Sequence, residues 1–458
     1  MKIGTSPQLL LDGYIVDNTW AIRHKAQHVE RVFHQPQKHP DNPLLKVQGG
    51  YVCVARDPDA DGFHLWYQTH IAGTDEARTQ YAIAYAFSKD GLNWDVPKLG
   101  LHEWQGSKDN NIVIRGPRRR ASGPWLLDVP EADRRGYKYV LSYRDSDGTH
   151  FIGTHDGVHF DAESDRLIQR LHSDTQNAIV FDPHRQQYLM YCRAKAVYRA
   201  FGEDPIDTGE SRRIALVANR ELWADWPKEA QNILLPDELD TQQRYHAFYG
   251  MPTRVYAGVF FGFLWPFRWN DRIHTELAWS RDGVHFERHP LRPRVVDYGP
   301  ADAWDDEMVF ASSWVEDGDE WRVYYSGWVG PHGTPQRTGS IGLATIRKEG
   351  FVSLHGPAGG GVVCTRMLRW PGGKLFLNAA AKEGAVTVRV SGPERKVIPG
   401  FDHTDCRDFH GDSTAAEICW KGRTLDELTG QPIRLEFFIQ NCDLYSFRAD
   451  PGKTASSD

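Results

Sequence analysis

One short motif occurs three times in this chain of 458 residues. Residues 88–94 read Ser-Lys-Asp-Gly-Leu-Asn-Trp, residues 154–160 read Thr-His-Asp-Gly-Val-His-Phe, and residues 280–286 read Ser-Arg-Asp-Gly-Val-His-Phe. The first two copies start 66 residues apart, and the second and third start 126 apart, which is twice 63. Less exact copies, without the Asp-Gly pair, stand at 217–223 and 345–351, which are the positions where this spacing predicts two further repeats. Five copies at a fixed spacing indicate a repeat architecture.

The repeated motif has the chemistry of a β-hairpin turn, because Asp and Gly tolerate the positive φ that such turns require. A second hairpin precedes each copy and ends in aromatic residues. These hairpins join 52–55 to 63–67, 125–127 to 137–143, 178–181 to 188–191, 253–256 to 259–264, and 309–314 to 321–325. Each hairpin and the strand pair after it make four antiparallel strands, which is a propeller blade. The alternative is a β-sandwich with coincidental turn motifs, and five copies in register favour the propeller.

The length predicts two domains. Beyond the fifth repeat, the glycine-rich segment 356–361 indicates a linker, and short alternating strands follow, for example at 385–390 and 433–439. Strands at this spacing are typical of a small sandwich. We therefore expect an all-β chain, with a five-bladed β-propeller over residues 1–352 and a C-terminal β-sandwich over 357–450 that contributes stability rather than chemistry.

Composition argues against several classes of function. The net charge is −7 and the only basic run is at 118–120, so nucleic-acid binding has little support. Six scattered cysteines without CxxC spacing favour neither a disulfide framework nor a zinc site, and we expect no metal and no cofactor. No apolar stretch approaches the length of a signal-peptide core or of a spanning helix, so we expect a cytoplasmic protein without a membrane partner.

The inner strands of a propeller all begin at one mouth, and acids precede two of them. Asp174 comes just before the strand at 178–181, and Asp305, Asp306 and Glu307 come before the strand at 309–314. Because successive side chains of an extended segment point to opposite sides, at most two of those three acids can face the central funnel of the propeller. Hydrolysis of a glycosidic bond needs one carboxyl group as acid and another as base or nucleophile. We expect Asp174 to be the base, nucleophile or sugar-orienting carboxylate and Glu307, or Asp305, to be the general acid, although such acids also serve as turn residues.

Seven polar or aromatic residues near the predicted strand ends are candidates for substrate binding. Asp12 is a candidate if the apolar run at 9–16 forms a strand that closes the ring of blades. The two arginines belong to predicted inner hairpins, and the other four residues belong to strand starts or loops. The candidates are Asp12, Arg193, Tyr245, His246, Arg254, Trp304 and His332.

The Ser-x-Asp-Gly-x-x-Trp turns, Asn42-Pro43 near the start and the predicted C-terminal sandwich together resemble the five-bladed β-propeller glycoside hydrolases. These are the relatives of glycoside hydrolase families 32, 43 and 68, and especially the bacterial proteins described as family 32 N-terminal-like. The resemblance implies a propeller hydrolase with a carbohydrate substrate. Arg56-Asp57-Pro58 is like one family 32 motif but lies in a predicted hairpin turn, and the Trp-Met-Asn-Asp-Pro-Asn and Glu-Cys motifs are missing. The catalytic residues of family 32 are therefore not carried over. The resemblance rests on residues 9–16, 34–36, 106–113, 277–286, 350–354, 375–378 and 411–413.

Three functions remain open. The first is a glycosidase (hydrolase acting on O-glycosyl bonds) in carbohydrate metabolism, with furanosides among the candidate substrates. The second is a carbohydrate-binding propeller without catalysis, since propellers host many functions. The third is a glycoside phosphorylase, which needs basic residues for phosphate, such as Arg244, His246 and Arg254. Two carboxyl groups roughly 5 to 10 Å apart would favour hydrolysis, and a single acid among aromatic residues would favour binding.

Overall fold

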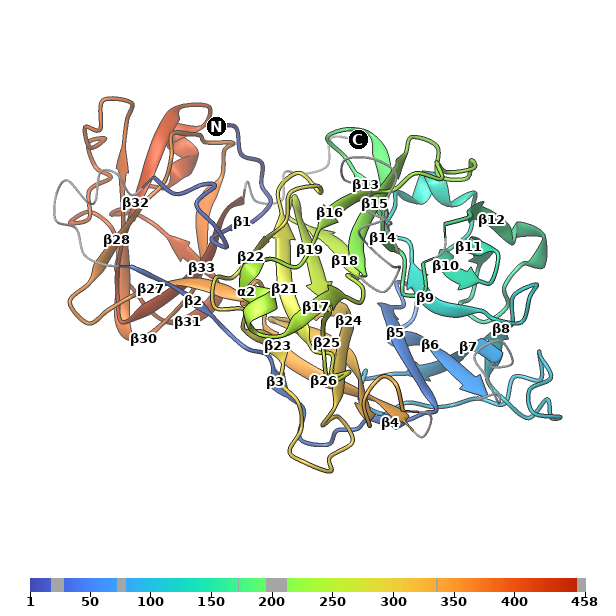
Figure 1. Ribbon diagram of the computed structural model, residues 1–458. Coiled ribbons are helices and arrows are strands. Elements are labelled where there is room, and N and C mark those ends of the chain that lie inside the picture. The colour runs from blue at the N-terminus through green and yellow to red at the C-terminus, as the bar shows by residue number, and fades with distance from the viewer. Residues whose placement is uncertain (18–28, 72–79, 172, 195–211, 335–336, 451–458) are drawn as a thin grey trace, which may run out of the picture. The chain divides into compact units, whose positions relative to one another are not determined.

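The computed structural model describes residues 1–17, 29–71, 80–171, 173–194, 212–334 and 337–450. The chain divides into two compact units, each of them built from strands (Figure 1). The propeller unit comprises Gln35–Asp317 and Arg322–Thr345, and the C-terminal unit comprises Met1–His34, Gly318–Trp321 and Ile346–Asp458.

The propeller unit contains five antiparallel blades in its described part, each beginning with its inner strand. This confirms the predicted five-bladed propeller. Blade I contains β5 (Gly49–Arg56), β6 (Phe63–Ile71), β7 (Gln80–Ser88) and β8 (Ile112–Ile114). Blade II contains β9 (Ser122–Leu126), β10 (Tyr139–Asp145), β11 (Gly148–Thr154) and β12 (Arg166–Gln169), with η2 (Glu131–Arg134) and η3 (Ala162–Ser164) in its loops. Blade III contains β13 (Ala178–Asp182), β14 (Gln187–Ala194), β15 (Arg213–Asn219) and β16 (Gln231–Leu234).

Blades IV and V carry additional short strands. Blade IV contains β18 (Thr253–Tyr256), β19 (Val259–Leu264), β21 (Thr275–Ser280), β22 (Glu287–Arg288) and β23 (Arg294–Val296). Blade V contains β24 (Met308–Asp317), β25 (Glu320–Val329) and β26 (Thr338–Arg347), and its outer edge is formed by β3 (Gln37–Lys38) and β4 (Leu45–Lys46). Because β3 and β4 come from near the start of the chain, they close the ring of blades by pairing with its last strand.

The repeated motif forms the same turn after the third strand of blades I, II and IV. In each turn the Asp carboxylate accepts hydrogen bonds from two backbone N–H groups, at 2.8 Å and 2.8 Å for Asp90, 2.9 Å and 2.7 Å for Asp156, and 2.9 Å and 2.8 Å for Asp282. The Ser or Thr hydroxyl at the start of each motif accepts from the glycine N–H. The three glycines have φ of 73°, 80° and 73°. The predicted hairpin chemistry is confirmed at atomic detail.

Separate apolar clusters fill the spaces between neighbouring blades. Val54 and Leu343 belong to the cluster shared by blades I and V, and Trp66 and Leu141 to the one shared by blades I and II. Clusters of the same kind lie between blades II and III, III and IV, and IV and V. Aromatic side chains supply much of this contact, which accounts for part of the chain's aromatic content.

Blade IV has an extension beyond the start of its inner strand. It is a two-stranded sheet of β17 (Tyr245–Phe248) and β20 (Pro266–Arg268), preceded by α2 (Glu238–Gln242). Hydrogen bonds from Tyr249 N to Trp265 O (2.7 Å) and from Trp265 N to Gly250 O (3.0 Å) continue the ladder of the β18–β19 pair into this sheet.

The C-terminal unit is organised around one long strand, β30 (Lys374–Ser391). The first part of β30 pairs with β31 and β33, and its last part pairs with β32. Leu377 from the first part and Val388 from the last enter the same apolar core. The remaining elements are β1 (Gln8–Leu9), β2 (Glu30–Phe33), β27 (Val352–Gly356), β28 (Gly361–Cys364), β29 (Leu368–Arg369), β31 (Phe409–Ile418), η4 (Leu425–Leu428), β32 (Pro432–Gln440) and β33 (Cys442–Asp450).

The units divide the chain differently from the expected boundaries of 1–352 and 357–450. β1 pairs with β33 and β2 pairs with β27, so the N-terminal residues through His34 complete the C-terminal sheet. Edge strands expose unpaired backbone groups that distant segments can satisfy, and a local pattern does not reveal which segment does so. In the described part of the chain, no helix is long and apolar enough to cross a membrane.

Candidate active site

Four blades and the extension of blade IV supply side chains to one group of residues at the mouth, the end of the propeller where the inner strands begin. Tyr51 lies near the start of β5, Arg144 near the end of β10, and Asp174 just before β13. Tyr249 lies between β17 and β18, and His332 follows β25. Contacts among these residues, described below, define the candidate site.

Asp174 is the carboxylate of this group. Arg144 Nη1 lies 2.9 Å from Asp174 Oδ1, and Arg193 Nη2 lies 3.4 Å from Asp174 Oδ2. The Asp174 side chain is 37% exposed, whereas that of Arg193 is 1% exposed. Two guanidinium groups stabilise the ionised form of a carboxyl group. Asp174 is therefore a fixed, solvent-accessible carboxylate.

Arg193 and Tyr249 together connect Asp174 to His332. The guanidinium groups of Arg193 and Arg212 lie 5.0 and 5.1 Å from the centre of the Tyr249 ring, and the Tyr249 hydroxyl lies 2.9 Å from His332 Nε2. Burial, followed by the charges of Arg337, Arg212 and Arg193, lowers the pKa of His332 to about 3. His332 is therefore a neutral hydrogen-bonding group near neutral pH.

A β-bulge brings Tyr51 into this group. The register of β5 against β6 shifts between Gly50 and Val52, and the intervening Tyr51 has φ of 51°. A side chain on Gly50 would lie 2.7 Å from the Trp328 ring, so only glycine fits beside the bulge. Burial and a hydrogen bond with Tyr249 raise the pKa of Tyr51 well above its ordinary value. Tyr51 is thus held protonated, and bulges commonly direct a side chain into a functional site.

A chain of aromatic rings runs from the site along the blade IV extension. Phe267 lies 5.2 Å from His332 and 5.2 Å from His246, and His246 lies 4.8 Å from Trp269. Trp269 is 70% exposed. An exposed ring next to a polar mouth is suited to stacking against a sugar.

The structure brings together three of the predicted site residues, Asp174, Arg193 and His332, with His246 on the adjoining extension. Glu307 lies at the start of β24, where its Oε2 is 2.9 Å from Arg272 Nε, and its side chain is 30% exposed. Glu307 is therefore held by a different arginine from the two that hold Asp174.

Asp305 and Trp304 lie in contacts within blade V and with its closing strand. Asp305 is buried, with Lys38 Nζ 2.6 Å and the Tyr325 hydroxyl 3.1 Å from its Oδ2. Because Lys38 belongs to β3, this ion pair joins the closing strand to blade V. Trp304 stacks on Tyr325 with ring centres 5.4 Å apart. In these contacts both side chains contribute to the closure of the ring, and their predicted roles in catalysis and substrate binding stay predictions.

Three other predicted binding residues have different neighbours among the contacts described. Tyr245 is buried beside His274, with ring centres 5.1 Å apart. Arg254 donates to the backbone carbonyl of Trp314, in the later part of β24, and so links two inner strands. Asp12 belongs to the C-terminal unit, where its buried carboxylate accepts from Tyr14 N at 2.9 Å. It supports a turn there.

Sequence reasoning missed five residues of the group: Tyr51, Arg144, Arg212, Tyr249 and Arg337. Arg144 lies at the end of a second strand, and Arg212 and Arg337 directly precede third strands, whereas the expected site residues come mainly from the starts of inner strands. The Gly49-Gly50 pair before Tyr51 was the one local signal, since glycine in a strand marks a bulge.

Within the described ranges, no group of three or more His, Cys, Asp or Glu side chains is arranged to hold a metal ion. All six cysteines are free thiols.

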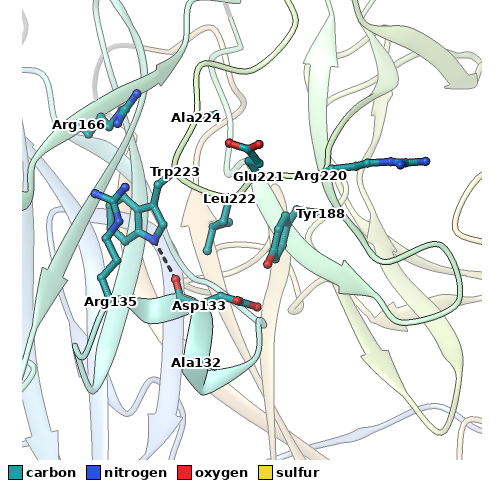
Figure 2. A pocket seen from close by; sticks show the side chains of 10 residues that line it. All are labelled: Ala132, Asp133, Arg135, Arg166, Tyr188, Arg220, Glu221, Leu222, Trp223 and Ala224. Atoms are coloured by element: carbon teal, nitrogen blue, oxygen red, sulfur yellow. Dashed lines mark hydrogen bonds between the residues drawn. The ribbon is translucent and has the colours of Figure 1, made fainter.

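A separate pocket lies at the opposite end of blades II and III (Figure 2). Figure 2 shows Trp223 beside Arg135, which lies 4.6 Å from its ring centre, and Trp223 Nε1 donates to Asp133 O at 2.8 Å. Arg135 and Asp133 come from the connection between β9 and β10, and Trp223 follows β15, so these three residues lie at the opposite end from the starts of the inner strands. The pocket is lined by Ala132, Asp133, Arg135, Arg166, Tyr188, Arg220, Glu221, Leu222, Trp223 and Ala224.

No family model matches the sequence, and no curated protein is similar to it. Several solved structures are similar at low identity. An N-acetylgalactosamine deacetylase from F. plautii is 16% identical over 70% of this chain and 95% of its own, with a TM-score of 0.44. The β-1,2-mannobiose phosphorylase from Listeria innocua is 11% identical over 69% and 97%, with a TM-score of 0.45. The GH43 protein BlXynB from Bacillus licheniformis is 11% identical over 92% and 99%, with a TM-score of 0.44. Similarity at this level does not transfer an activity.

Proposed function

We propose that this protein is a glycoside hydrolase that cleaves a glycosidic bond of a carbohydrate at the mouth of its propeller. The observation that carries the proposal is the Asp174 carboxylate, which is accessible yet held by Arg144 and Arg193. A preorganised, ionised carboxylate is suited to act as the base or nucleophile of such a reaction. Tyr51, Tyr249 and His332 provide hydrogen-bonding groups around it for sugar hydroxyls.

The second carboxyl group in this proposal is Glu307. It lies at the start of the inner strand β24, as Asp174 precedes the inner strand β13, and both side chains are accessible. A general acid must be protonated when substrate is bound. In the unliganded protein Arg272 contacts Glu307, so the acid role requires substrate to loosen that ion pair.

A glycoside phosphorylase is the second candidate, because arginines outnumber carboxylates among the described residues around Asp174. Arg144, Arg193, Arg212 and Arg337 all lie in or beside the group. Phosphate binding relies on such guanidinium clusters. Turnover that requires inorganic phosphate and yields a sugar phosphate would select this candidate over hydrolysis.

The test is a screen of aryl glycosides and oligosaccharides with the wild-type protein, Asp174→Asn and Glu307→Gln. Asp109→Asn is the matched control, because Asp109 is 73% exposed and pairs only with the exposed Lys98 among the contacts described. We expect the wild-type protein and the control to cleave the same glycosides and the two site variants to lose that activity. Full activity in both site variants would refute the assignment, and absence of any cleavage would favour a non-catalytic, carbohydrate-binding propeller.

A further inference from the structure

We propose that the mouth contains an oxyanion subsite, formed by Arg193, Arg212 and Arg337, that takes a carboxylate or phosphate group carried by the sugar substrate. The proposal deepens the proposed function, since it names an acidic sugar as the substrate of the same site.

The three arginines are gathered around two rings. Arg193 and Arg212 lie 5.0 and 5.1 Å from the centre of the Tyr249 ring. Arg337 Nη1 donates to the backbone carbonyl of His332 at 2.6 Å, and His332 in turn contacts Tyr249. All three guanidinium groups bear electrostatically on His332. They therefore form one cluster rather than three separate surface charges.

The charge of the cluster is not balanced by the acids described there. Asp174 lies within ion-pair distance of Arg144 and Arg193, while Arg212 and Arg337 have no ion-pair partner in the described part of the chain. Arg193 is 1% exposed, and among the described residues its Nε and Nη1 have no hydrogen-bond partner, nor does Arg212 Nε. A buried guanidinium with unused donors is costly unless a ligand supplies acceptors.

The aromatic surroundings define what kind of anion fits. The faces of Tyr249 and Phe267 already hold Arg212, with both ring centres 5.1 Å from its guanidinium, and this fixes the plane of its donors. A fixed guanidinium plane favours paired hydrogen bonds to the two oxygens of a carboxylate or phosphate group. The chain of rings that leads to Trp269 offers an apolar face for the rest of a sugar.

The experiment measures binding of matched sugars to the full chain by isothermal titration calorimetry. The pairs are galacturonate with galactose and glucose 6-phosphate with glucose, and inorganic phosphate is titrated alone. Arg212→Met and Arg337→Met remove charge while keeping side-chain length, and the exposed Arg220→Met is the control. We expect at least one acidic sugar to bind ten-fold or more tightly than its neutral partner, and each site variant, but not the control, to remove this preference. Thermal unfolding of each variant checks that it is folded.

Equal binding of acidic and neutral sugars, or no binding of any acidic sugar, would overturn the proposal. Inorganic phosphate that binds as tightly as the acidic sugars would also overturn it, because the subsite would then serve a free oxyanion. The two proposals fail separately. Cleavage of neutral glycosides without any acidic preference would leave the hydrolase standing, whereas acidic sugars that bind but whose glycosides are never cleaved would leave the subsite standing.

Discussion

The two ends of the propeller unit are built on different principles. At the end that carries the repeated turns, Asp90, Asp156 and Asp282 make nearly the same hydrogen bonds in three different blades. At the mouth, the blades contribute different side chains, among them a tyrosine on a bulge, an arginine at a strand end and an aspartate before a strand. The repeated end maintains the architecture, and the irregular end carries the candidate chemistry.

The difference follows from what each end has to do. A hairpin turn needs only local hydrogen bonds, so one short motif can be reused wherever a blade needs that turn. A site needs several chemical groups around one substrate, so neighbouring blades must differ there. Mutations at the two ends should therefore separate stability from activity.

The largest expected effect contrasts one aspartate from each end. Asp174→Asn should lower turnover about 10³-fold, because it removes the charge proposed for the base or nucleophile. Asp282→Ala should leave the turnover of the folded protein unchanged and lower the melting temperature, because alanine has no acceptor for the two turn N–H groups. Steady-state kinetics and thermal unfolding of both variants measure this. Loss of turnover in Asp282→Ala at temperatures where it is folded would contradict the separation of roles.

The next effect concerns ring closure. Lys38→Met leaves the buried Asp305 without its cation and should lower the free energy of unfolding by about 3 kcal/mol. Lys98→Met is the matched control, because Lys98 and Asp109 are both more than 70% exposed, and exposed pairs contribute roughly 0.5 kcal/mol. Urea unfolding compares the two variants. If Lys38→Met abolished turnover while it stayed fully stable, Asp305 would belong to the active site after all.

A smaller effect is expected at a single repeated turn. Asp90→Ala should cost about 1 kcal/mol, as expected for a side chain that satisfies backbone N–H groups. Hydrogen bonds, led by that from Asn93 N, hold the pKa of Asp90 below its ordinary value. Its contribution is therefore present above about pH 4 and is lost as the pH falls toward the lowered folded-state pKa. The free energy of unfolding of the wild-type protein, Asp90→Ala and the exposed control Lys89→Ala is measured between pH 7 and pH 3. The loss of stability in Asp90→Ala should shrink as the pH falls. A loss that stays constant would argue against a contribution from the ionised carboxylate.

The smallest expected effect is at the exposed aromatic ring of the extension. Trp269→Ala should raise KM for oligosaccharides about five-fold, equivalent to roughly 1 kcal/mol of stacking, and should leave stability unchanged. Leu291→Ala, at another strongly exposed apolar residue of the propeller unit, is the control. An unchanged KM for every oligosaccharide that is cleaved would remove Trp269 from the site.

Part of the site was accessible from the sequence because its residues precede or end predicted strands. Asp174 and His332 are predicted in this way and Arg193 as an arginine of an inner hairpin, and the three lie together. Asp305 meets the same criterion, but its carboxylate contacts Lys38. The neighbouring Trp304 stacks on the Tyr325 ring. A position before a strand does not determine which side the side chain faces.

The sequence by itself determined the blades, because a hairpin turn and the alternation of a strand are written in adjacent residues. The period of the Asp-Gly motif set the number of blades, and the paired runs between the motifs located the inner hairpins. Tertiary structure alone decided which distant groups meet: Lys38 with Asp305, β2 with β27, and Arg212 with Tyr249 and His332. These contacts join residues far apart in the chain, and their free energy depends on burial and charge at places that no local pattern records.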